Sequence, residues 1–345
     1  MSDSTSDEAR PRALGGRPLS ADSPLFGGPL PAEAGAEEAG VPERGYDARA
    51  DDFASGDPRA LDPPTFGDGA SIDDRRELLP APDDERSLDD WGRSERVLEL
   101  VDPLLNFYYR YWFRVEVEGI ENVPMDGGAL LVSNHSGALP PDAPMIMQAI
   151  RNELPRPRPV YMLGEHWFKG YPGVGMLANK IGLVAAHPQN AQRLLRDEGR
   201  LALVFPEGQK GSRKVFWQRY RLRRFGRGGF VRTALRAGVP IVPIALVGGE
   251  EAMPIFAHVG LAQRLTGLIY FPINHAFPHF GLAAGAMYLP AKFRIRFLEP
   301  IDLSDYPPDV VDDAAEVQAI AERVRGQIQR QLDSLLAERD SVWLG

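Results

Sequence analysis

The chain contains no cysteine. Disulfide bonds, thiolate zinc sites and a cysteine nucleophile are therefore excluded. Long hydrophobic runs are also lacking: the most apolar segments, 238–249 and 281–291, contain proline and fall short of the ~18 residues that a membrane-spanning helix needs. We therefore expect a cytoplasmic protein that is soluble or lies on a membrane surface.

Residues 1–90 lack lysine and any sustained apolar period. They hold 22 Asp and Glu, 9 Arg, 11 Pro and 10 Gly, which gives a net charge of −13. Such a composition buries too little apolar surface to offset the entropy of ordering. We predict that residues 1–90 form a disordered acidic tail, and that they are not a secretory signal. Residues 91–345 are mildly basic and long enough for one large α/β domain.

In that body, apolar segments of strand length alternate with segments of helical period. This pattern predicts an α/β fold with a mixed, largely parallel sheet flanked by helices. At its start, Ser94 is a candidate helix cap and Pro103 predicts a kink or two short helices. At its end, a long helix is predicted with one packed face, formed by Val317, Ile320, Val324, Ile328, Leu332 and Leu335.

Two polar loops follow predicted strands, where α/β sheets form their sites. The first, NHSGALPPD, spans residues 134–142. His135 can act as a general base with Asp142 holding its tautomer, or the loop can be a simple turn. The second, PEGQKGSRK, spans residues 206–214, and its glycines and basic residues suit an anion or form a charged surface loop.

Residues 213–232 hold seven arginines, one lysine and no acidic residue, with aromatic residues interleaved. This composition suits a nucleic acid, a coenzyme A diphosphate, anionic lipid headgroups or a solvated helix face. The histidines of HAFPH, residues 275–279, have metal-like spacing. They lack the glutamate of the zinc motif, and Pro278 opposes a helix, so we expect no metal site.

Together these blocks resemble the lysophospholipid/glycerol acyltransferase family. The N-H-x4-D block appears as NHSGALPPD, the F-P-E-G block is complete at 205–208, and the apolar V-P-[IV]-x-P strand matches VPIVPIAL at 239–246. The blocks occur in the family's order within about residues 107–300. The second block is only faintly present.

The resemblance implies a single acyltransferase domain over residues 91–345. It implies acyl transfer from acyl-CoA or acyl carrier protein to a hydroxyl of a glycerolipid such as a lysophosphatidic acid, without a covalent intermediate, metal or cofactor. His135 and Asp142 would be catalytic. The substrate-binding residues would be Asn134, Phe205, Pro206, Glu207, Gly208, Lys210 and Arg213. The aromatic segment 107–113 would supply an acyl trough and a contact with the inner face of the membrane.

This chain departs from the family pattern in two places. Six residues rather than four separate His135 from Asp142, and QKGSR replaces the family's Thr-Arg-Ser after F-P-E-G. The second departure puts a phosphorylated acceptor in doubt, so a neutral alcohol such as diacylglycerol, phytol or a wax alcohol stays open. A non-catalytic lipid or CoA-binding module is a further alternative. We expect no nucleic-acid partner.

Overall fold

A computed structural model describes residues 88–136, 141–164, 174–208, 211, 213–258, 272–275 and 287–345. The predicted tail, apart from its last three residues, lies outside this part of the chain. The described residues form a seven-stranded sheet with the order β1-β9-β6-β2-β5-β3-β4. Its strands are β1 (Glu116–Glu118), β2 (Ala129–Ser133), β3 (Val160–Gly164), β4 (Leu183–Ala185), β5 (Leu201–Val204), β6 (Ile241–Val247) and β9 (Arg294–Phe297).

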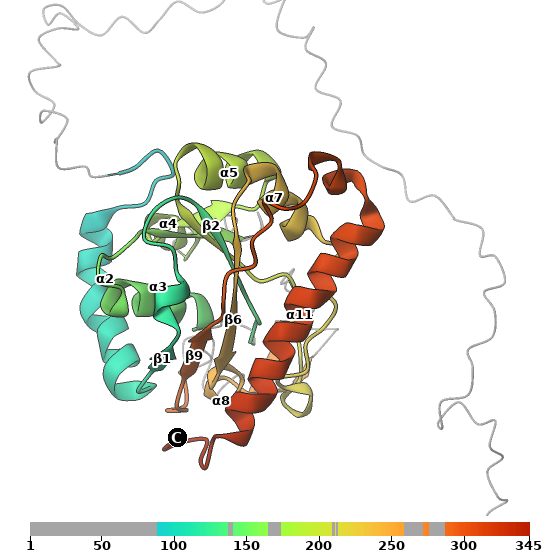
Figure 1. Ribbon diagram of the computed structural model, residues 1–345. Helices are drawn as coiled ribbons and strands as arrows, with labels where there is room; N and C mark the ends of the chain where they lie inside the picture. The colour runs from blue at the N-terminus through green and yellow to red at the C-terminus, as the bar shows by residue number, and fades with distance from the viewer. Residues whose placement is uncertain are drawn as a thin grey trace, which may run out of the picture. The chain divides into compact units, whose positions relative to one another are not determined.

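All neighbouring strands of this sheet run parallel except β6 and β9, which pair antiparallel. The prediction of a mixed, largely parallel sheet is therefore confirmed. Helices cover both of its faces (Figure 1). They are α2 (Glu95–Phe107), α3 (Asp142–Glu153), α4 (Val174–Lys180), α5 (Pro188–Gln192), α7 (Gly229–Ala237), α8 (Gly249–Ala252) and α11 (Ala314–Ala337). Strands β7 (Ile255–His258) and β8 (Pro272–Asn274) form a separate pair.

The central strand β2 is buried on both sides because each face of the sheet carries its own core. Ala129 and Leu131 belong to the cluster shared with α3, whereas Leu130 and Val132 belong to the cluster shared with α7 and α11. Successive side chains of β2 point to opposite faces of the sheet, and both faces are covered by apolar residues. The strand is therefore a continuous apolar run in the sequence. Burial on both sides also fixes the register of β2, and with it the position of the loop that follows.

Helix α11 packs against the sheet through the face that the sequence predicts. All six predicted residues are fully buried, as is Ala321. Each such aliphatic side chain larger than alanine contributes roughly 1.5–3 kcal/mol to stability. The helix begins at the N-cap Asp313, whose carboxylate accepts hydrogen bonds from the backbone N–H groups of Ala315 and Glu316.

Helix α2 rules out one of the two alternatives predicted for it, a pair of short helices. Ser94 does cap it, with its Oγ accepting a 3.3 Å hydrogen bond from the Val97 N–H, but Pro103 lies inside one continuous helix. Pro103 and Glu99, the residue one turn earlier, are both exposed. Water can therefore satisfy the Glu99 carbonyl that loses its helical donor, and the ring clashes with no packed neighbour. A π-helical turn, Tyr108–Trp112, continues the helix.

Candidate active site

Three loops meet at one edge of the sheet, where β2, β5 and β6 end. In the register of these parallel neighbours, Val132 pairs with both Val204 and Pro243. The loops that begin at Asn134, Phe205 and Gly248 therefore leave the sheet side by side. The expectation that the two polar loops open at one edge is correct, and the loop after β6 joins them.

His135 and Asp142 are in contact despite the longer loop between them. The His135 Nδ1 lies 3.2 Å from the Asp142 Oδ2. Residues 137–140 lie outside the described part of the chain, but Asp142 is well placed as the first residue of α3. A helix N-terminus favours a carboxylate through its free N–H groups and its dipole.

Asp142 is fully buried and accepts further hydrogen bonds from Ser136. The Ser136 N–H donates to Oδ2 at 2.7 Å, and the Ser136 hydroxyl donates to Oδ1 at 2.6 Å. The carboxylate therefore has one fixed orientation, in which Oδ2 faces the imidazole. Because an ionised carboxylate only accepts, it places the His135 proton on Nδ1 and leaves Nε2 as the acceptor.

The imidazole of His135 packs face to face against the aromatic ring of Phe205. It stacks on Phe205, with centroids 4.4 Å apart and an interplanar angle of 19°. Its side chain keeps 17% exposure, unlike the fully buried Asp142, so the ring can meet a substrate. Phe205 thus contacts the predicted base.

Glu207 is buried and touches the base through the backbone. Its Oε1 accepts a 3.2 Å hydrogen bond from the His135 N–H, and its Oε2 accepts one of 2.8 Å from the Arg223 N–H. Gly208 follows in a tight turn, with its N–H donating to the Phe205 carbonyl at 2.9 Å and a φ of 54° that favours glycine. The F-P-E-G block therefore builds a turn that supports His135.

Two of the predicted substrate ligands have other partners. The side-chain amide of Asn134 is 1% exposed and exchanges two 2.9 Å hydrogen bonds with the backbone of Leu246. It ties β2 to β6 beyond the ladder. Glu207 is 3% exposed. The burial and the protein partners of both side chains favour a supporting role over direct substrate contact.

Of the remaining predicted ligands, Pro206 is half-buried and Arg213 is exposed beside the site. The Arg213 carbonyl accepts a 2.9 Å hydrogen bond from the His258 Nε2. Lys210 lies outside the described residues. The structure thus brings His135, Phe205 and Asp142 together, and it leaves Lys210 unplaced.

Lys214 and Glu250 form a buried ion pair that the sequence analysis did not predict. The Lys214 Nζ lies 2.9 Å from the Glu250 Oε1 and 3.4 Å from the Glu207 Oε1. Burial acts to lower the pKa of Lys214, but the two carboxylates outweigh it and raise that pKa. Burial raises the pKa of Glu250 to about 7, although Lys214 opposes the shift. The signal was available, because GGEE directly follows the strand β6.

The arginine-rich segment runs past the site with its side chains alternating in and out. Tyr220 and Phe225 are buried in the core, whereas Trp217 is 63% exposed. Arg219 lies over the Phe216 ring, 4.4 Å from its centroid. Because most of the interleaved aromatic residues pack inward, they do not form the stacking platform that single-stranded nucleic acid requires.

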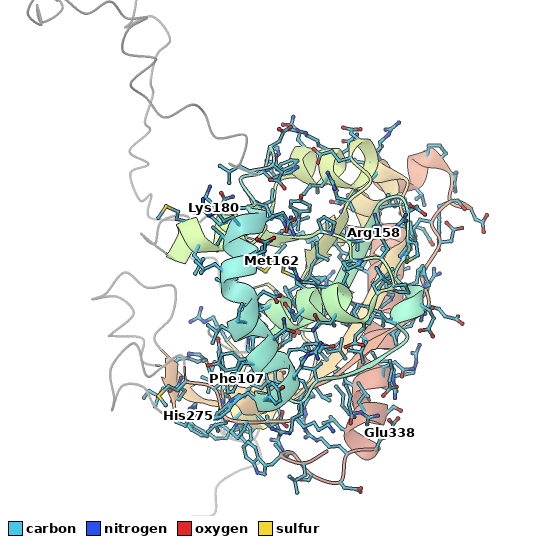
Figure 2. All side chains as sticks on the ribbon, turned by 90° about the vertical axis from the view of Figure 1, so that its left-hand side faces the viewer. Phe107, Arg158, Met162, Lys180, His275 and Glu338 are labelled. Carbon is cyan, nitrogen blue, oxygen red and sulfur yellow. The ribbon has the colours of Figure 1, made fainter. Side chains whose placement is uncertain are left out.

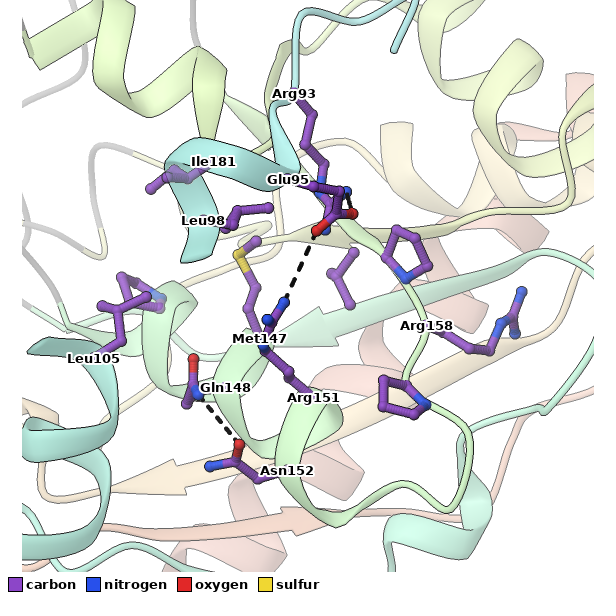
Figure 3. A pocket seen from close by; sticks show the side chains of 14 residues that line it. Arg93, Glu95, Leu98, Leu105, Met147, Gln148, Arg151, Asn152, Arg158 and Ile181 are labelled. Atoms are coloured by element: carbon purple, nitrogen blue, oxygen red, sulfur yellow. Dashed lines mark hydrogen bonds and ion pairs between the residues drawn. The ribbon is translucent and has the colours of Figure 1, made fainter. Parts of the chain in front are cut away.

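A cavity of about 390 Å³ lies between α2, α3 and the start of β3 (Figure 3). Leu98 and Leu105 of α2 and Met147 of α3 supply apolar walls, and Arg151 lines its polar side. Pro144, two residues after Asp142, also lines it.

Among the described residues, no cluster of three potential metal ligands occurs. In the same part of the chain, no helix is long and apolar enough to cross a membrane.

Known proteins are similar in sequence to this chain. A family model described as Acyltransferase matches residues 114–247. An uncharacterized protein of Mycobacterium tuberculosis is 46% identical over 246 residues, which cover 71% of this chain and 68% of that protein. The human protein named DGAT1/2-independent enzyme synthesizing storage lipids is 26% identical over 223 residues, covering 64% of this chain and 62% of that protein.

Among solved structures, the 1-acyl-sn-glycerophosphate (LPA) acyltransferase PlsC of Thermotoga maritima is 20% identical, with a TM-score of 0.46 over 71% of this chain and 83% of that one. That score is too low to bear on the fold or the function. The family model spans the loops of His135 and Glu207 and the strand β6, which are the blocks that carry the sequence resemblance. The chain therefore belongs to the acyltransferase family.

Proposed function

We propose that this protein transfers an acyl group from an acyl thioester, either acyl-CoA or acyl carrier protein, to a hydroxyl of a glycerolipid such as a lysophosphatidic acid. The contact between His135 and Asp142 at the carboxyl edge of the sheet is the observation that supports this most strongly. It gives a base with a fixed tautomer, an Nε2 that can accept a proton, and partial exposure of the side chain.

In the proposed reaction, the His135 Nε2 takes the proton of the acceptor hydroxyl as its oxygen attacks the thioester carbonyl. The new C–O bond forms, the C–S bond breaks, and the departing thiolate receives the proton from the imidazolium. Asp142 stabilises that imidazolium through Nδ1. No covalent enzyme intermediate, metal or cofactor takes part in this scheme.

We place the acyl chain in the cavity between α2 and α3 rather than along the whole aromatic segment 107–113. Leu98, Leu105 and Met147 give it apolar walls, and Pro144, which also lines it, belongs to the helix that begins at Asp142. Within the aromatic segment, Tyr109 and Phe113 are core residues with 3% and 0% exposure, so they cannot line an open trough.

A neutral alcohol acceptor is the second candidate, and the loop after F-P-E-G favours it. Lys214 turns inward to Glu207 and Glu250, where it cannot meet a substrate phosphate. The human relative's name refers to storage lipids, which fits an acceptor without phosphate. Lys210 and Arg213 stay the candidate phosphate ligands.

A thiol-release assay with a panel of acceptors tests both candidates. Because the chain has no cysteine, a thiol reagent reports the released CoA or carrier thiol without background from the protein. Lysophosphatidic acid, diacylglycerol and a long-chain alcohol are compared, each with wild type and His135→Ala. We expect His135→Ala to lose on the order of 10²–10⁴-fold in kcat.

The pattern across acceptors then assigns the class. If the acceptor is phosphorylated, Lys210→Ala and Arg213→Ala raise its KM and leave that of a neutral alcohol unchanged. Near wild-type turnover by His135→Ala contradicts the proposed role of the loop. Binding of acyl-CoA with no turnover of any acceptor favours the non-catalytic lipid or CoA-binding module instead.

A further inference from the structure

Lys214 is an ammonium group inside the protein, although it belongs to a polar loop. Its side chain is 1% exposed, and its Nζ contacts Glu250 and Glu207, whose side chains are 5% and 0% exposed. Burying an ion costs several kcal/mol even when it is paired, and apolar replacements are often as stable. Stability alone is therefore a poor reason for placing these charges here.

Glu207 carries the effect of Lys214 to the base. The same Oε1 that lies 3.4 Å from the Lys214 Nζ accepts the 3.2 Å hydrogen bond of the His135 N–H. The other oxygen holds the Arg223 N–H at 2.8 Å. With both oxygens engaged, the ionised form of Glu207 fixes the backbone from which the imidazole projects.

Glu250 fixes Lys214 in turn from the end of β6. Its Oε1 lies 2.9 Å from the Lys214 Nζ and accepts a 3.0 Å hydrogen bond from the Tyr220 N–H. The neighbouring Gly249 packs directly on Asp142, because a Cβ there would lie 2.4 Å from the Asp142 Oδ1. One ammonium therefore joins the loops after β2, β5 and β6.

We propose that Lys214 is a positioning residue for acyl transfer: it fixes Glu207, and through Glu207 the backbone of His135, in the geometry that proton transfer needs. This inference rests on the proposed role of His135 as the base.

The test compares Lys214→Met, Glu207→Gln and their double variant in the thiol-release assay, at a temperature well below every Tm. A displacement of about 1 Å can cost on the order of 10²-fold in rate. We expect Lys214→Met to lose at least about 10-fold in kcat while the KM of donor and acceptor change by less than about 3-fold, as expected for misplacement of a catalytic group. Because both residues act on His135 along one path, the double variant should be no slower than Glu207→Gln alone.

A charge-matched variant separates positioning from stability. Lys214→Met combined with Glu250→Gln removes one positive and one negative charge, so it should recover much of the thermal stability that Lys214→Met loses. Its kcat should stay low, because no ammonium group then fixes the Glu207 carboxylate. Recovery of kcat together with Tm would overturn the inference, as would multiplied losses in the Lys214→Met/Glu207→Gln variant.

Two controls keep this result distinct from the proposed function. Lys292→Met removes a lysine whose side chain pairs with Glu116 of the edge strand β1, and it should retain wild-type kcat. His135→Ala is run in parallel. If His135→Ala is inactive and Lys214→Met is fully active, only the positioning role fails. If His135→Ala is active, the proposed function itself fails.

Discussion

At the scale of single residues, the geometry of the His135–Asp142 pair depends on the hydrogen bonds and burial of Asp142. The loop of six residues between His135 and Asp142 suggested a loose partner, yet Asp142 is fully buried and each of its oxygens has a donor from Ser136. Asp142→Asn replaces one of the two accepting oxygens with an amide NH2 group, which donates. That group would face a donor of Ser136 or the Nδ1–H of His135. We expect a kcat loss on the order of 10²-fold or more, as for loss of general-base catalysis. A rate within about threefold of wild type would show that the carboxylate is dispensable.

Gly249 is a second residue whose identity the site requires. A Cβ at this position would lie 2.4 Å from the Asp142 Oδ1 and 2.8 Å from the Ser136 Oγ, closer than such atoms approach. Gly249→Ala should therefore displace the carboxylate and lower kcat more than it lowers Tm. Gly229→Ala is the matched control, because its Cβ would meet no atom within 4 Å. It lies at the start of α7, where alanine favours the helix. Equal kcat for the two variants would contradict this reading of Gly249.

At the scale of elements, α2 and the π-helical turn that continues it carry an exposed apolar stripe. The stripe comprises Leu100, Leu104, Phe107 and Tyr111, with exposures of 79%, 59%, 45% and 71%. Their spacing of four, three and four residues places them along one helical face. Figure 2 looks onto this helix, with Phe107 labelled near one end. We propose that the stripe is the site of peripheral contact with the inner face of the membrane, as an amphipathic helix lying in the interface.

Flotation with anionic vesicles measures this contact. Leu100→Glu combined with Leu104→Glu should lower the bound fraction strongly, since it places charges in the apolar layer. Met125→Glu is the control, because Met125 is an exposed apolar residue, 36% exposed, in the loop before β2 and outside the stripe. Equal binding by wild type and the α2 variant would mean that the stripe does not contact lipid.

The junction of α11 with β9 predicts a pH dependence. Hydrogen bonds from Ser334 and Arg296 lower the pKa of the exposed Glu338 from its ordinary 4.5 to about 2. A carboxylate with a depressed pKa in the folded state stabilises the protein above pH 4.5 and loses that contribution as the pH falls towards 2. Thermal unfolding across this range should show a shallower decline of Tm for Glu338→Gln than for wild type. Glu299→Gln, at an exposed position beyond β9, should follow wild type. Parallel curves for Glu338→Gln and wild type would contradict this.

At the scale of the whole molecule, the acidic tail should contribute little to stability. Its composition gives it no apolar core, and the sheet with its two clusters lies within the described residues from 88 onward. Deleting residues 1–87 should leave the Tm of the remaining chain nearly unchanged in calorimetry. A broad or strongly lowered transition would show that the boundary of the domain lies earlier in the chain.

The sequence by itself determined the fold class, the packed face of α11 and the two polar loops. These features depend on local patterns: apolar period, strand length and residues that follow a strand end. It also pointed to the acyltransferase family through blocks that are contiguous in the chain. It failed in allowing two short helices at Pro103, because α2 runs through that residue as one helix; only the exposure of the surrounding helix shows that the lost hydrogen bond can be met by solvent.

Only the tertiary structure decided which side chains meet. Asn134 and Glu207 look like substrate ligands in the sequence, but burial commits them to Leu246, Lys214 and the backbone of His135. Glu250 lies 36 positions from Lys214 and 115 from His135 in the sequence, and no local pattern relates them. The pairing of β2 with both β5 and β6 brings these loops to one edge. Long-range strand order sets those contacts, and a single sequence does not encode it in any period or motif.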